Sequence, residues 1–159
     1  MRFLVAVVAM VPAVAWAVVP TPGGPVSGTT IVVNANAGDQ DDPHVSGDLA
    51  AYTDKSGANW TIRYFNFLTN ADAMVPSSGD TDLLSDVSQT RIAFSRVMAD
   101  RTACMIYDVA SALLTEVDPV AGSSRLGTAI GGNTVAFVEL TPATATSSSW
   151  IFPRACPRT

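Results

Sequence analysis

Residues 43–69 read PHVSGDLAAYTDKSGANWTIRYFNFLT, and this stretch decides the fold class. A Gly-Asp turn at 47–48 is followed by an apolar strand at 49–53, a polar turn and an aromatic strand at 60–67. Short strands rich in β-branched and aromatic residues, bounded by Gly, Asn, Asp and Ser, are typical of antiparallel hairpins. The stretch therefore predicts two neighbouring strands of an all-β domain.

The same unit returns along the chain. With a shift of 42 residues, the pattern of 45–66 falls on 87–108, and with a further shift of 43 its first half falls on 130–137. Identical pairs in the first two copies are Val45/Val87, Ser46/Ser88, Ala51/Ala93 and Val75/Val117. A self-similar unit of about 40 to 45 residues made of short strands is typical of one β-propeller blade. We therefore expect an all-β partial β-propeller of four-stranded antiparallel blades, with a small β-sandwich or barrel as the alternative.

These residues also resemble a known family, the secreted TolB-like propeller repeat. The matching positions of the first unit are Asp42-Pro43, Val45-Ser46-Gly47-Asp48, Tyr52, Ile62, Asn66 and Thr69. The second unit departs from the pattern at Gln89-Thr90, where the Gly-Asp turn belongs, and the third loses the pattern after Phe137. The resemblance covers about residues 38–140. It implies blades that serve protein–protein interaction in the periplasm or outside the cell, although its motifs are structural and say little about function.

The N-terminal residues lie outside the repeat. Residues 1–17 combine Arg2, a nine-residue apolar run and an A-x-A site at 15–17, which predicts a removable signal peptide and an exported protein, periplasmic or extracellular. Nine apolar residues are too few to span a bilayer, so a membrane anchor is the weaker interpretation. Residues 18–29 are rich in Pro and Gly and predict an extended linker. The β-branched run at 30–34 predicts a strand, either one that completes the last blade or a simple edge strand.

Residues 30–152 are expected to hold the blades, with units at about 38–80, 81–123 and 124–152. Pro142 to Ser149 is a low-complexity stretch, residues 149–152 predict a further strand, and residues 153–159 form an out-of-pattern tail. A ring of six blades needs about 250 residues, whereas the sequence has 159. We therefore expect a fragment of a longer protein, while self-association that completes the ring and a different small all-β fold remain alternatives.

Three side chains are candidates for binding. Trp60 and Tyr64 belong to the aromatic strand and could stack on a sugar or a peptide, although such side chains more often pack between neighbouring blades. His44 is the only histidine and follows a run of acids. Because no nucleophile is placed near His44, a loop histidine without a catalytic role is the preferred interpretation.

The acidic run before His44 is a weak candidate for a calcium site. Asp39, Asp41 and Asp42 offer oxygen ligands, which Ca²⁺ prefers, but their spacing does not satisfy an EF-hand loop. Asp is also an ordinary turn residue, so the segment 38–42 is expected to be a turn. We expect no cofactor and no resident metal.

Composition narrows the classes of partner and of chemistry. The formal net charge is −5 and Lys55 is the only lysine, which argues against nucleic acid and anionic membrane surfaces as partners. The sequence has no G-x-S-x-G elbow, no P-loop and no H-E-x-x-H motif, so no catalytic residue is nominated. Cys104 and Cys156 are the only cysteines, and export would permit a disulfide between them without requiring it.

The expected function is that of an exported, non-catalytic binding or scaffold module with a protein partner. The loops at one end of the blades would recognise that partner by shape. The alternative is the propeller part of a secreted peptidase or carbohydrate-active enzyme whose catalytic domain is missing. A third, weaker hypothesis is an adhesin that binds glycans through Trp60.

Overall fold

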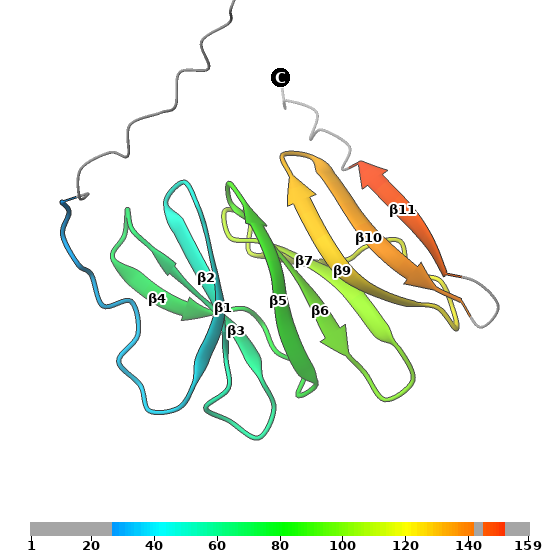
Figure 1. Cartoon of the computed structure of the whole chain (residues 1–159), viewed down its shortest axis with the longest axis horizontal. Helices are drawn as coiled ribbons and strands as arrows, with labels where there is room; N and C mark the ends of the chain where they lie inside the picture. The colour runs from blue at the N-terminus through cyan, green and yellow to red at the C-terminus, as the bar shows by residue number, and fades with distance from the viewer. Residues whose placement is uncertain (1–26, 142–144, 152–159) are drawn as a thin grey trace, which may run out of the picture. The chain divides into compact units, whose positions relative to one another are not determined.

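The computed structural model describes residues 27–141 together with the backbone of 145–151. Within these ranges the chain forms no helix, and its eleven strands make three antiparallel sheets (Figure 1). No helix of the described part is long and apolar enough to cross a membrane. The expected signal peptide, most of the expected linker and the expected tail lie outside the described residues.

Each sheet is built from strands that follow one another along the chain, and we call the three sheets blades 1, 2 and 3. Blade 1 contains β1 (Gln40–Ser46), β2 (Leu49–Asp54), β3 (Thr61–Asn66) and β4 (Ala71–Met74). Blade 2 contains β5 (Thr81–Ser88), β6 (Arg91–Val97), β7 (Thr102–Asp108) and β8 (Leu113–Glu116). The described part of blade 3 contains β9 (Ser124–Gly131), β10 (Thr134–Leu140) and β11 (Ala145–Ile151). The predicted fold class, a partial propeller of antiparallel blades, is thereby confirmed.

The first two strands of each blade are joined by a two-residue turn that needs a positive backbone φ. The residues with this φ are Gly47 at 57°, Gln89 at 56° and Gly132 at 56°. Glycine adopts such angles without steric cost, whereas Gln89 does so against its preference. The turn is thus retained in blade 2 even though its sequence has lost the Gly-Asp signature.

Almost every position of the strands β2, β6 and β7 is buried, and the central residues of these strands are apolar on both faces. On β6, Ile92 and Phe94 belong to the core between blades 1 and 2, and Ala93 belongs to the core between blades 2 and 3. Cys104 and Ile106 of β7 extend the second core. Because successive side chains of a strand point to opposite faces of the sheet, blade 2 packs against blade 1 on one face and against blade 3 on the other.

A buried ion pair ties the connection between blades 1 and 2 to the start of blade 2. Arg96 donates from Nε and Nη2 to the two carboxylate oxygens of Asp82, both at 2.8 Å, and also to the Pro76 carbonyl at 2.9 Å. The equivalent cross-strand pair of blade 3 is Arg125 and Glu139, so the charges have exchanged strands. Arg125 likewise donates to backbone carbonyls of the blade 2–blade 3 connection.

The structure corrects three local expectations. The strand predicted at 30–34 does not form, because its residues pair with no described strand. The segment 38–42 is only partly a turn, because Gln40 and Asp41 already pair with Asp54 and Thr53 of β2. The strand predicted at 149–152 begins earlier, at Ala145 within the low-complexity stretch, since the ladder with β10 outweighs the weak strand propensity of serine.

Candidate functional site

The strand β1 forms one edge of blade 1 and is the most exposed strand of that blade apart from β4. Its pairing with β2 is interrupted by a bulge between Asp41 and His44, and Asp42 adopts a φ of 53°. Pro43 at the bulge has no N–H to donate. A bulge and a proline both discourage another strand from pairing with an edge, so β1 is better suited to presenting side chains than to extending a sheet.

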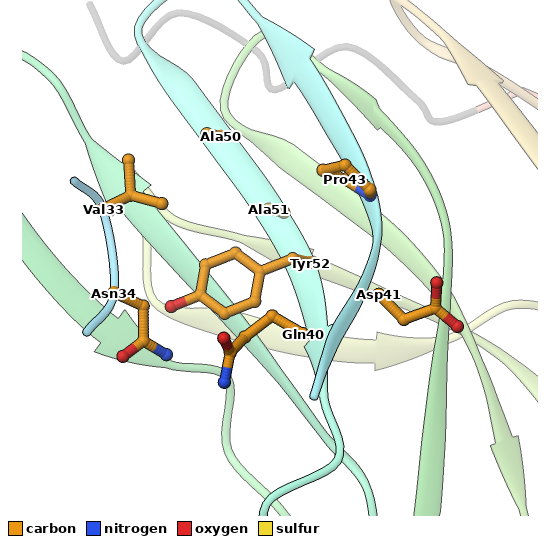
Figure 2. Close-up of a pocket in the computed structure, with 8 residues that line it drawn as sticks. All are labelled: Val33, Asn34, Gln40, Asp41, Pro43, Ala50, Ala51 and Tyr52. Atoms are coloured by element: carbon orange, nitrogen blue, oxygen red, sulfur yellow. The ribbon is translucent and has the colours of Figure 1, made fainter. Parts of the chain in front are cut away.

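Beside β1 lies a hollow of about 230 Å³, shown in Figure 2. Residues from β1, from β2 and from the chain before β1 line it: Val33, Asn34, Gln40, Asp41, Pro43, Ala50, Ala51 and Tyr52. The hydroxyl end of Tyr52 is directed toward Asn34, and Gln40 lies beside the ring (Figure 2). The surface of the hollow is thus mostly apolar, with a few polar groups gathered around Tyr52.

The polar groups next to the hollow form a connected network across blade 1. The Tyr52 hydroxyl donates to Asp72 Oδ1 at 3.1 Å, and Asp72 also accepts hydrogen bonds from Arg63. Burial raises the pKa of Tyr52, with Arg63 opposing and Asp72 supporting the rise. The hydrogen bond to Asp72 raises the pKa of Arg63. At neutral pH the network therefore presents a neutral phenol and a charged guanidinium, both hydrogen-bonded to Asp72.

The same positions in blade 2 are apolar. Strand register aligns Tyr52 with Phe94, Arg63 with Met105 and Asp72 with Leu114. In blade 2 these side chains pack against blade 1 as part of a hydrophobic core. The corresponding face of blade 1 has hydrogen-bonding groups instead, which suits a partner that is not another apolar blade face.

His44, a predicted binding residue, lies on β1 but does not line the hollow. Its Nε2 is 3.3 Å from Asp42 Oδ1 and its Nδ1 is 3.5 Å from Asp86 Oδ1 on β5. Asp86 in turn accepts a hydrogen bond from the Ile130 N–H on β9 at 2.9 Å. These contacts link the first strands of the three blades, so His44 has a structural partner on the neighbouring blade.

Trp60 lies at the end of blade 1 that carries the β2–β3 turn. The Lys55 ammonium is 4.3 Å from the centre of the Trp60 ring and 2.5 Å from Asp41 Oδ2. The hydrogen bond from Lys55 holds the pKa of Asp41 below its usual value, and the backbone N–H of Asp42 adds to this effect. Through Lys55 and Asp41, Trp60 is connected to the rim of the hollow.

Tyr64, the third predicted binding residue, is half-buried against the core between blades 1 and 2. Its ring centre is 6.0 Å from that of Tyr107 on blade 2. The structure thus places Trp60, Tyr64 and His44 apart, and each makes contacts with the fold itself.

The three calcium candidates do not converge on one point. Asp39 is exposed, Asp41 is engaged by Lys55 and Asp42 lies beside His44. Among the described residues, no group of three or more His, Cys, Asp and Glu side chains is arranged to hold a metal ion.

A second hollow, of about 410 Å³, lies at the opposite end of blades 1 and 2 from Trp60. Four turns line it through Gly47, Asp48, Leu49, Asn66, Leu68, Gln89, Thr90, Val109 and Ala110. Leu68 at its rim is 77% exposed. This is the surface where loops from two neighbouring blades meet.

Cys104 is fully buried, and its sulfur accepts a hydrogen bond from the Thr128 hydroxyl at 3.3 Å. Burial raises the pKa of this thiol, so it stays protonated at neutral pH. Cys156 lies outside the described residues. In this environment Cys104 acts as a small buried hydrophobe.

Sequence reasoning did not nominate Asn34, Gln40 and Tyr52 around the hollow. One available signal was the repeat itself, because Tyr52 and Arg63 stand where the second unit has Phe94 and Met105. A polar substitution at a position that is apolar in the neighbouring copy marks a face with a different role.

Comparison with known proteins identifies the fold but no relative that is close in sequence. No protein-family model matches the sequence, and no curated protein matches it. A solved structure assigned as TolB from Agrobacterium tumefaciens matches with a TM-score of 0.59 and 11% identity, over 75% of this chain and 47% of that one. A solved structure assigned as a conserved lipoprotein from Clostridium novyi NT matches with a TM-score of 0.55 and 9% identity, over 77% of this chain and 93% of that one.

The described chain therefore spans about half of the TolB structure but nearly all of the lipoprotein structure. The expectation that the sequence is a piece of a longer protein stays a prediction. At 9% and 11% identity the likeness concerns architecture alone. The resemblance to TolB-like blades is confirmed at this level: the chain has a TolB-like, propeller-type fold.

Proposed function

We propose that this chain is an exported, non-catalytic binding module that holds a protein partner in the hollow beside β1. The observation that carries the proposal is the hollow itself, mostly apolar with polar groups placed around Tyr52. Pockets that enclose whole small molecules usually measure 300 to 1,000 Å³. A hollow of about 230 Å³ better suits one or two side chains of a partner protein.

The groups around the hollow indicate the chemistry of the partner segment. An apolar side chain would fill the space above Ala50, and a neighbouring backbone amide would meet Asn34, Gln40 and the Tyr52 hydroxyl. Because β1 is blunted by its bulge and by Pro43, the segment would be held by side chains rather than by a new strand. Export is supported by the predicted signal peptide and by the likeness to a structure assigned as a lipoprotein.

Peptide selection tests the proposal. Peptides selected from a random display library on the wild-type protein would be measured for binding to Ala50→Arg, in which the new side chain fills the hollow. We expect at least a tenfold loss of affinity. Leu68→Arg is the matched control because it places the same charge at the rim of the second hollow. Circular dichroism of both variants confirms that they are folded.

Two outcomes would count against the proposal. Peptides that bind Ala50→Arg as well as the wild type would exclude the hollow beside β1. Peptides that lose affinity only for Leu68→Arg would assign binding to the turns between blades 1 and 2 instead.

A further inference from the structure

Blade 3 has one face against blade 2 and another that no described residue covers. On β9 and β10, Ile130, Val135 and Phe137 are buried in the core shared with blade 2. The residues that alternate with them are exposed and uncharged: Leu126, Ala129, Gly131, Ala136, Val138 and Leu140. We call these six residues the outer face of blade 3.

Blades 1 and 2 each hold the next blade with a serine at the end of their first strand. Ser46 Oγ accepts a hydrogen bond from the Gln89 N–H at 3.0 Å, and Ser88 Oγ accepts one from the Gly132 N–H at 3.0 Å. Both serines occupy the last paired position of their strand. The equivalent residue of blade 3 is Gly131, which has no side chain to accept a hydrogen bond.

Blade 3 also lacks two other side chains that accept hydrogen bonds from the next blade in blades 1 and 2. Thr53 Oγ1 accepts a hydrogen bond from the Leu84 N–H at 2.9 Å, and the residue in register with Thr53 in blade 3 is Val138. Asp86 Oδ2 accepts from the Ile130 N–H, and the residue in register with Asp86 is Ala129. Each of these three positions has changed from an acceptor to an apolar residue.

The lack of these hydrogen-bond acceptors limits which surfaces can pack against the outer face of blade 3. A further blade of the same kind would bury backbone N–H groups without partners, at about 1–3 kcal/mol each. Stacking on blade 1 of a second copy would bury the Arg63–Asp72 pair against aliphatic side chains, which disfavours a ring closed head to tail. A second outer face of blade 3 presents neither problem, because it has no charge and needs no acceptor.

We propose that the outer face of blade 3 binds the same face of a second copy of this chain around a two-fold axis. Leu126, Val138 and Leu140 are 38%, 38% and 40% exposed in the single chain and would be covered by their counterparts. Sheets commonly pack face to face through apolar side chains, and two-fold symmetry is the commonest arrangement of identical chains. The dimer leaves the hollow beside β1 free on each copy, so it does not depend on the proposed function.

Sedimentation velocity of the purified full chain tests the proposal. The wild type is expected to sediment as a dimer at micromolar concentration, and Val138→Asp as a monomer, with a dissociation constant at least 100-fold higher. Val97→Asp is the matched control, because Val97 is a valine of similar exposure, 41%, on β6 of blade 2. It is expected to leave the dimer intact.

A cysteine scan fixes the orientation of the two copies. In a Cys104→Ser, Cys156→Ser background, Ala136→Cys is expected to form a disulfide between copies, whereas Ala50→Cys on blade 1 is not. A monomeric wild type, a dimer that survives Val138→Asp, or cross-linking only when Ala136→Cys and Ala50→Cys copies are mixed would each overturn the proposal. The last of these results would indicate the head-to-tail ring.

Discussion

At the scale of single residues, Tyr52 shows how the fold changes the chemistry of a side chain. It stands where the next blade has Phe94, and its hydroxyl donates to Asp72. The ring therefore fills the place of an aromatic core residue, while the hydroxyl gives the open face of blade 1 a polar group. The same side chain contributes to packing and to the candidate site.

Tyr52 also predicts a pH dependence of stability. Burial raises its pKa above the unfolded value of 10.0, so its contribution is fully present below pH 10 and is lost as the pH rises through the folded pKa. The stability difference between the wild type and Tyr52→Phe should be constant from pH 7 to about 9 and should shrink above pH 10. Urea unfolding of both proteins across this range measures the difference. A difference that stays constant or grows up to pH 11.5 would contradict the assignment.

At the scale of the elements, a guanidinium fixes each of the two links between consecutive blades, β4–β5 and β8–β9. In blade 2 this group belongs to Arg96 on β6, and in blade 3 it belongs to Arg125 on β9. The acidic partner changes strand as well, from Asp82 to Glu139. Both blades thus have a charge pair at the same position between their first two strands. The arginine lies on the second strand in blade 2 and on the first strand in blade 3.

The buried pair predicts an asymmetric response to mutation. Arg96→Met leaves Asp82 buried without a partner and should lower the free energy of unfolding by about 3–5 kcal/mol. Asp82→Leu combined with Arg96→Met should recover most of this loss, because the unpaired charge is removed. Arg63→Met is the control, since the partly exposed Arg63–Asp72 pair should contribute at most about 1 kcal/mol. Urea titration checks all three, and a loss below 1 kcal/mol for Arg96→Met would refute the expectation.

At the scale of the whole molecule, blade 2 belongs to two hydrophobic cores. Phe94 points into the core with blade 1, and Ala93 next to it points into the core with blade 3. Because β6 and β7 each contribute side chains to both cores, disruption of one core should destabilise the other. Blades that depend on their neighbours in this way are expected to unfold together.

Hydrogen exchange tests this coupling. Phe94→Ala should destabilise the protein by about 3–5 kcal/mol and should lower amide protection in β2, β6 and β10 by similar amounts. Leu113→Ala, at a residue that is 61% exposed, should leave all three strands protected. If protection falls in β2 and β6 but stays unchanged in β10, the blades unfold separately and the coupling is absent.

The sequence by itself determined the period of the fold and its strand pairs, because turn residues and alternating apolar residues are local signals. The turn at 47–48 and the strands around Tyr52 and Tyr64 were predicted within a residue or two. The failures were the run at 30–34, which has no described strand to pair with, and the serine-rich start of β11, where pairing with β10 outweighs propensity.

Only the tertiary structure decided which faces were buried and which were left open. His44 and Tyr64 meet Asp86 and Tyr107 on the next blade, contacts that their neighbours in the sequence do not indicate. Trp60 instead meets Lys55 of its own β2–β3 turn. The hollow beside β1 forms because Val33 and Asn34 lie against a blade face whose floor is alanine. Such contacts depend on how blades stack, and stacking arises from packing between residues that are far apart in the chain.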